Sequence, residues 1–409
     1  MNYTDEHVAL CALNKIYGYH PAIALSLMEK AGSALALFGP AGPPVGAGGD
    51  GAAVMPGTPS VISSEAEKSP HPELLTQLTP SALEWARGEL STLEARGFRF
   101  VSIIDEDYPE ALRECEAPPL GLYLNGSSSP TEIFGMRPMI GFVGTRDISP
   151  YGKLWCQKLV RALAEAPIQP CIVSGMAMGA DGIAHQTALE CGLTTIGVMA
   201  TGIDSIYPWQ HEKLAMEIVS RPGCGLVTDY PLGTSPVALN FLRRNRIIAG
   251  LVSAVVVVES KSRGGSLMTA KYACEYSRDL FALPGRIDDV RSAGCNSLIH
   301  AQMARIITSP EELVGELGLG RLSRGAGGSW AAGAGASLRS VLARKYGEGS
   351  APVYIGDLVQ GNTGITVEAI AARLHLPHQD ILTAVAIMEA DGILTTDILG
   401  RCSLTANYA

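Results

Sequence analysis

The chain has 409 residues, 47% of them hydrophobic and 17% charged, so it is long enough for two to four domains with a sizeable core. Its nine cysteines form no Cys-x-x-Cys pair, and no apolar stretch reaches the roughly twenty residues of a membrane-spanning helix. No signal peptide is visible at the N-terminus. We therefore expect a cytoplasmic protein with reduced thiols, no metal site and no membrane association.

The net charge of −9 argues against nucleic acid as a ligand, but the charge is unevenly distributed. Residues 1–120 contain 16 acidic and 7 basic residues, which accounts for the whole net charge. Residues 240–291 instead contain 9 basic and 5 acidic residues. A local positive patch of this kind favours nucleic-acid binding, although a solvated face with ordinary ion pairs explains it equally well.

The N-terminal residues 1–40 have helical apolar spacing with a break at 17–21, which predicts a helical hairpin module. Residues 41–79 are predicted to be a flexible insertion, because they are rich in Gly, Pro, Ala and Ser over 39–63. A helix is expected at 80–96, followed by a strand, a short helix and a second strand that lead into a sheet.

Four short apolar segments predict the centre of that sheet. They read MIGFV, CIVS, TTIGVMA and SAVVVVE, and each is followed by a turn of small residues. Strands without polar alternation are buried on both faces, which is typical of a doubly wound parallel α/β sheet. Ligands of such sheets bind beyond the carboxyl ends of the strands, and glycine-rich turns there favour a phosphate-bearing ligand.

The C-terminal part is predicted to be a separate domain. Residues 316–337 have the composition of a linker, and 338–409 show three helical patterns followed by two short strands. This is the winged-helix pattern. Basic residues are few on its second and third helices, so we expect a partner-binding or accessory role rather than readout of duplex DNA.

Taken together, the motifs resemble those of the DprA/Smf family of DNA-processing proteins over roughly residues 100–310. The resemblance rests on the ordered segments GFVGTRDISPYG, IVSGMAMGADGIAHQTAL, TIGVMATGIDSIYPWQHEKL, TDYPLGTSP, FLRRNRIIAGL, VVVVESKSRGGSLMTAKYA, LFALPGRID and GCNSLI. It implies an extended Rossmann-like domain, here 80–315, that binds single-stranded DNA. It also implies a non-enzymatic homodimer that loads the RecA recombinase during natural transformation, with no cofactor.

Five positions depart from the usual family pattern. Met178 stands where an arginine is common, Ala180 where isoleucine is, Leu242 where proline is, and Gln302 where glycine is. The family's usual Ser-Gly-Ser turn is Gly264-Gly265-Ser266 here, so Gly264 stands where serine is common. The missing arginine at Met178 removes one charge-assisted contact from a phosphate cradle.

Sixteen residues are candidates for binding DNA or its phosphates. They are Gly144, Thr145, Arg146, Ser174, Gly175, Met178, Gly179, Phe241, Arg243, Arg244, Asn245, Arg246, Gly264, Gly265, Ser266 and Thr269. We expect Arg243 and Arg246 to share a helix face that Arg244 does not, with at least one arginine toward DNA and one paired with Asp229 or Glu259.

Several of these candidates also have a structural interpretation. Arg146 is suited to a bidentate phosphate contact, or to an ion pair with Asp181. Phe241 is placed to stack on a base, or in the core. The hydroxyls of Ser174, Ser266 and Thr269 suit phosphate binding or helix capping equally. Asp181 is expected to cap a helix, with His185 on the same face and no third member of a catalytic triad.

Two other functions remain open from the residues alone. One is a nucleotide-hydrolysing enzyme of the nucleoside monophosphate phosphoribohydrolase type, with Glu259 as the catalytic carboxylate; the other is a nucleotide-binding regulatory module. A row of cations at 243–246 favours a strand binder over either. For the implied homodimer, the apolar segment 280–307 at the end of the sheet is the expected contact, unless it packs under the protein's own helices.

Overall fold

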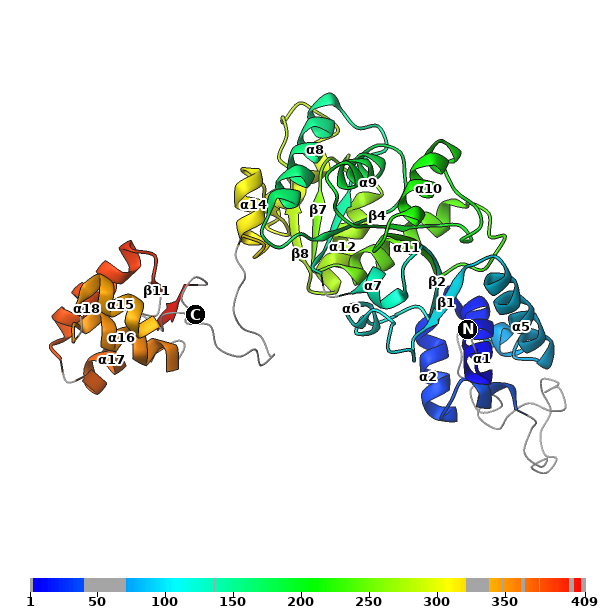
Figure 1. The fold of residues 1–409 in the computed structure, drawn as a ribbon, viewed down its shortest axis with the longest axis horizontal. Coiled ribbons are helices and arrows are strands. Elements are labelled where there is room, and N and C mark those ends of the chain that lie inside the picture. Colours follow the sequence, from blue (N-terminus) through cyan, green and yellow to red (C-terminus); the bar gives the residue numbers. More distant parts are fainter. Residues whose placement is uncertain are drawn as a thin grey trace. The chain divides into compact units, whose positions relative to one another are not determined.

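The computed structural model describes residues 3–39, 71–135, 137–320, 338–347, 349–361, 365–374, 376–396 and 401–405. The expected insertion and linker lie largely outside these ranges, although the short helix α4 (Pro72–Leu75) falls within the expected insertion. The chain divides into two compact units, Met1–Leu322 and Ser323–Ala409 (Figure 1). Across the described ranges, none of the helices combines the length and apolar character needed to cross a bilayer.

A nine-stranded sheet forms the centre of the first unit, in the order β1-β2-β6-β5-β4-β3-β7-β8-β9. The strands are β1 (Arg99–Ser102), β2 (Gly121–Asn125), β3 (Met139–Val143), β4 (Cys171–Ser174), β5 (Thr195–Val198), β6 (Gly225–Thr228), β7 (Ala254–Val257), β8 (Asp279–Ala282) and β9 (Arg305–Ile306). Strands from β6 to β9 in this order are parallel, whereas β1 and β2 add antiparallel to one edge. The predicted α/β fold with a mostly parallel sheet is confirmed.

Each central strand is continuously apolar because its alternate residues face two different cores. In β3, Ile140 and Phe142 pack under α8 and α9, while Met139 and Val143 pack under α11 and α12. The helices of this unit beyond the N-terminal segment are α5 (Pro80–Ala95), α6 (Glu110–Arg113), α7 (Pro130–Phe134), α8 (Pro150–Glu165), α9 (Ala180–Glu190), η2 (Trp209–His211), α10 (Glu212–Ser220), α11 (Ala238–Leu251), α12 (Ser266–Glu275), α13 (Ala293–His300) and α14 (Pro310–Glu316).

The N-terminal segment forms α1 (Asp5–Tyr17), α2 (Pro21–Ala31) and the 3₁₀ helix η1 (Leu35–Phe38), with the predicted break between the first two. The Thr4 side chain caps α1, and a proline begins α2. These helices share one core with α5, β1, β2 and α10 at the antiparallel edge of the sheet (Figure 1). The segment is therefore packed onto the sheet rather than around a core of its own.

The second unit has its own core around a small sheet. Its elements are α15 (Leu338–Tyr346), α16 (Ala351–Gly361), β10 (Ile365–Thr366), α17 (Val367–Leu374), α18 (His378–Ala390), β11 (Leu394–Thr396) and β12 (Arg401–Leu404). The two C-terminal strands pair as expected, and β10 adds to β12. The sequence pattern predicted three helices; the structure has a fourth, α16, whose apolar side packs into the same core through Val353, Ile355 and Val359.

Candidate functional site

A pocket of about 670 Å³ lies beyond the carboxyl ends of β3 and β7, where the strand order reverses direction. We call it the switch-point pocket. Its lining includes ten of the sixteen predicted residues: Gly144, Thr145, Arg146, Phe241, Arg244, Asn245, Gly264, Gly265, Ser266 and Thr269. Ala177, Asp181, Tyr207, Pro236, Ala238, Leu242 and Lys261 also line it. The sequence thus predicted the place of the pocket and about half of its lining.

Two glycines are required by how closely the turns approach each other. Gly179 begins α9 with a φ of +80°, and a Cβ there would lie 2.3 Å from the Thr145 carbonyl oxygen. A Cβ on Gly175 would lie 2.5 Å from the Arg244 guanidinium. Neither residue lines the pocket. Both act by letting the turn after β4 pack against the turn after β3 and against α11.

Arg146 is exposed at the pocket rim, directly after β3. Its guanidinium carbon lies 5.0 Å from the centre of the Phe241 ring, which it covers as a cation–π contact. The alternative ion pair with Asp181 does not form. No acidic partner of Arg146 occurs among the residues that the structure describes. Arg146 is therefore a cation held in place by an aromatic ring and available to an anion.

Arg244 lines the same pocket but is only 4% exposed. It donates to the carbonyl oxygens of Gly175 and Val198, at the ends of β4 and β5. Burial lowers the pKa of Arg244 to about 10, although nearby Asp181 opposes this shift. Burial likewise raises the pKa of Asp181, and Arg244 limits the rise. Arg244 therefore serves mainly to tie α11 to two strand ends.

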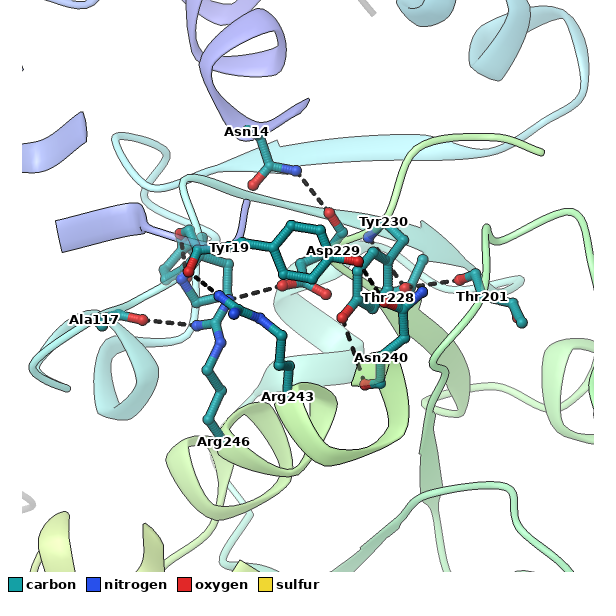
Figure 2. Close-up of polar contacts among 12 residues, drawn as sticks. Asn14, Tyr19, Ala117, Thr201, Thr228, Asp229, Tyr230, Asn240, Arg243 and Arg246 are labelled. Atoms are coloured by element: carbon teal, nitrogen blue, oxygen red, sulfur yellow. Dashed lines mark hydrogen bonds and ion pairs between the residues drawn. The ribbon is translucent and has the colours of Figure 1, made fainter. Parts of the chain in front are cut away.

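Arg243 and Arg246 point away from the pocket, into a polar network that joins α11 to the N-terminal segment (Figure 2). Arg243 donates to the Tyr19 carbonyl oxygen and lies 4.2 Å from the centre of its ring. Arg246 donates at 2.7 Å to both the Ala117 carbonyl oxygen and the Asp229 carboxylate. These contacts confirm that the two arginines share a helix face and that one of them forms a structural pair with Asp229.

The three arginines at 243–246, which favoured a strand binder in the sequence, do not form a row along the pocket. Each of the three arginines is held by backbone carbonyl oxygens, and two of them lie outside the pocket. A basic run on one helix distributes its side chains around the helix axis, so only part of it can face any one ligand. Of the predicted residues on this helix, Phe241, Arg244 and Asn245 reach the pocket lining.

The predicted hydroxyl and amide groups are largely engaged within the protein. Ser174 is fully buried and donates to the Phe142 carbonyl oxygen at 2.6 Å, so its assignment as a ligand contact is not supported. The Ser266 hydroxyl donates to Ser260 at 2.9 Å. The Asn245 amide donates to the Gly265 carbonyl oxygen at 3.2 Å. These bonds keep the turn after β7 in a fixed shape.

Lys261, Arg263, Tyr207 and Trp209 were absent from the predicted set. Lys261 and Arg263 are exposed beside the glycine turn, and neither has an acidic partner in the described part of the chain. The Tyr207 ring meets Phe241 edge-on at 5.4 Å, and Trp209 is 74% exposed. The two cations belonged to the basic stretch 240–291. Tyr207 lies in a loop and Trp209 begins the short helix η2, and no periodic pattern in the sequence marks either.

The groups that suggested catalysis are enclosed. Glu259 accepts from the Ser149 amide at 2.9 Å and its hydroxyl at 2.5 Å, which fixes the start of α8 and leaves the carboxylate outside the pocket lining. Burial lowers the pKa of His185 to about 3, and its Nδ1 bonds the Thr195 hydroxyl at 2.7 Å. No three His, Cys, Asp or Glu side chains cluster as metal ligands within the described ranges.

Two departures from the family pattern have a visible structural setting. Gln302 adopts a φ of +56°, the left-handed conformation in which a glycine is unstrained. Met178 is 42% exposed and lines a neighbouring groove rather than the switch-point pocket. It therefore changes the surroundings of the pocket without changing its fold.

Comparison with known proteins adds independent findings. The family model described as DNA recombination-mediator protein A matches residues 99–318. The Smf protein of Synechocystis is 42% identical over 221 residues, 54% of each chain, so the match spans about half of that relative's length. The putative DNA processing protein DprA of Mycobacterium tuberculosis is 31% identical over 323 residues, 76% of this chain and 78% of that one.

A solved structure agrees with these sequence matches. The DNA processing protein A of Streptococcus pneumoniae superposes with a TM-score of 0.60 at 28% identity, covering 77% of this chain and 99% of that one. The family match covers residues 99–318 and so includes the parallel sheet and the turns that build the switch-point pocket. The chain therefore belongs to the DNA recombination-mediator protein A family, which comprises the DprA and Smf proteins.

Proposed function

We propose that this chain is a cytoplasmic, non-enzymatic protein that binds and protects single-stranded DNA in its switch-point pocket and loads RecA onto it during DNA uptake and recombination. The observation that carries the proposal is the mixed lining of the pocket. Arg146 and Lys261 supply cations at the turns after β3 and β7, and Tyr207 and Phe241 supply aromatic rings beside them. Phosphates need the cations, and unpaired bases need the aromatic rings.

The enzymatic alternative has less support. Hydrolysis of a nucleotide needs a carboxylate that reaches the ligand, and both oxygens of Glu259 accept hydrogen bonds from Ser149 instead. A closed pocket for a single nucleotide also needs only one or two cations. Here Arg146, Lys261 and Arg263 lie open to solvent around the pocket, as suits a longer polyanion.

The first prediction concerns the form of the nucleic acid. The full chain should bind single-stranded DNA more tightly than duplex DNA of the same length, and both far more tightly than mononucleotides, because stacking requires unpaired bases. Each phosphate contact contributes about −0.7 to the slope of the logarithm of the association constant against the logarithm of the salt concentration. Three unpaired cations therefore predict a slope of about −2 or steeper. Gel-shift titrations at several salt concentrations measure both. Equal affinity for duplex DNA, or no salt dependence, would contradict the proposal.

RecA loading is the step that follows from strand binding. Its assay is the rate of RecA filament formation on single-stranded DNA coated with a single-strand-binding protein. A rate that this chain does not increase, despite tight strand binding, would limit the function to protection. The second unit is proposed to be a winged-helix accessory module; duplex binding by that unit comparable to that of the whole chain would contradict the accessory role.

We further propose that the chain forms a homodimer through the β9 edge of the sheet. Most apolar residues of 280–307, including Leu280, Phe281 and Leu298, are buried in the protein's own cores, but Met303 and Ile306 remain exposed at this edge. A sheet edge with exposed apolar residues suits a two-fold contact. Light scattering should show a dimer at micromolar concentration that Ile306→Glu dissociates; a monomer at all concentrations would refute it.

A further inference from the structure

A second cavity of about 560 Å³ adjoins the switch-point pocket along α8 and α9. We call it the lateral groove. Arg146 and Asp147 line both cavities, so the two meet at the turn after β3. From there the lining of the groove extends along the two helices through Lys153 and Gln157 of α8 and through Ile183 and Gln186 of α9. The candidate ligand site therefore extends past Arg146 rather than ending at it.

The charges around the lateral groove favour a polyanion. Its two acidic residues are each compensated, because Asp147 lies 3.4 Å from Arg291 and Glu190 lies 3.2 Å from Arg161. Its two cations are not: within the described ranges, neither Arg146 nor Lys153 has an acidic partner. The groove thus has uncompensated positive charge at the end nearest the switch-point pocket.

The remaining lining suits a base rather than a phosphate. Ile148, Met178 and Ile183 provide apolar surface, and Met178 is 42% exposed. The amides of Gln157 and Gln186 offer donors and acceptors of the kind that the edge of a nucleobase requires, although the Gln186 nitrogen already donates to Glu190 at 3.4 Å. Met178 stands where the family pattern commonly has arginine, so an apolar, polarizable side chain occupies this position instead of a cation.

We propose that the lateral groove is a second base-binding subsite for the same single strand. One phosphate of the strand contacts Arg146 between the two cavities, the adjoining bases occupy the groove over Met178, and Lys153 contacts the next phosphate. This inference rests on the proposed function, because it extends the path of the strand that the switch-point pocket binds. It predicts a longer footprint than the switch-point pocket alone can provide.

The test is fluorescence anisotropy on the full chain with labelled oligothymidylates from about 4 to about 16 nucleotides, the range of single-strand site sizes. Affinity should rise in a step when the strand is long enough to occupy both cavities. Lys153→Glu should reduce the ratio of long-strand to short-strand affinity by about tenfold, the equivalent of one charge-assisted phosphate contact. Lys158→Glu is the matched control, since Lys158 lies on α8, is exposed and lines neither cavity.

A second measurement does not depend on a variant. With 4-thiothymidine placed at successive positions, photocross-linking to the unmodified protein should yield peptides that contain Met178 or Gln157 for bases at one end of the strand. Equal effects of Lys153→Glu and Lys158→Glu, or cross-links confined to 207–209 and 236–242, would overturn the lateral groove while leaving strand binding intact. Absence of any binding to single strands would instead overturn the proposed function.

Discussion

Replacing Arg246 with alanine should lower the free energy of unfolding by about 3–5 kcal/mol, the cost of leaving a buried charge without its partner. Arg246 and Asp229 are 7% and 5% exposed and lie 2.7 Å apart. The variant also removes a donor from the Ala117 carbonyl oxygen. Chemical denaturation followed by circular dichroism measures the loss. The network in Figure 2 shows that the same pair joins α11 to β6 and to the loop before β2.

The loss of folding free energy in Arg246→Ala should depend on pH in a defined direction. Burial raises the pKa of Asp229, and Arg246 partly opposes this, so the variant raises that pKa further. A carboxyl group whose pKa is higher in the folded than in the unfolded state favours folding below its unfolded pKa and loses this contribution as pH rises through the folded pKa. The difference between variant and wild type should therefore be largest near neutral pH and shrink on acidification toward the unfolded pKa.

Two further variants test whether the unpaired buried charge causes the loss of stability in Arg246→Ala. Adding Asp229→Asn to Arg246→Ala removes the buried charge, so the double variant should be more stable than the single one. Arg161→Ala is the matched control, because it breaks an exposed pair with Glu190 at 3.2 Å, which is worth about 0.2–1 kcal/mol. A loss in Arg246→Ala no larger than that in Arg161→Ala would show that the buried pair contributes little.

Replacing Arg146 with alanine should weaken binding of single-stranded DNA by about 10- to 150-fold while leaving stability almost unchanged. The contact of a guanidinium with a phosphate is worth about 1.5–3 kcal/mol, and Arg146 has no ion pair in the described part of the chain to lose. The slope of the logarithm of the association constant against the logarithm of the salt concentration should also become shallower by about 0.7, which is the contribution of one phosphate contact. Anisotropy titrations together with thermal melting separate the two effects.

Arg87→Ala is the control for Arg146→Ala. Arg87 is exposed on α5, pairs with Asp5, and lines neither cavity. It should change binding only slightly, through the general loss of one positive charge. A lower melting temperature of Arg146→Ala with unchanged affinity would mean that its cation–π contact with Phe241 is structural and that the phosphate binds elsewhere.

The sequence by itself determined the sheet and the location of the pocket. The segment MIGFV reads as a buried parallel strand because both of its faces must be covered by helices, and β3 has one core on each side. Arg146 follows this strand within three residues, so its place beyond the carboxyl end follows from connectivity alone. Glycines such as Gly179 predict tight turns, because other residues disfavour a positive φ.

Only the tertiary structure decided which cations and aromatic side chains lie exposed at the pocket. Helical periodicity fixes the angle between Arg243, Arg244 and Arg246, but the rotation of α11 depends on burying Ile247 and Ile248 and on acceptors far along the chain. Those acceptors are the carbonyl oxygens of Tyr19, Val198 and Ala117 and the carboxylate of Asp229. Contacts across such separations have no local signature in the sequence. They engage the arginines of the basic helix within the protein and leave Arg146, Lys261 and Arg263 exposed around the pocket.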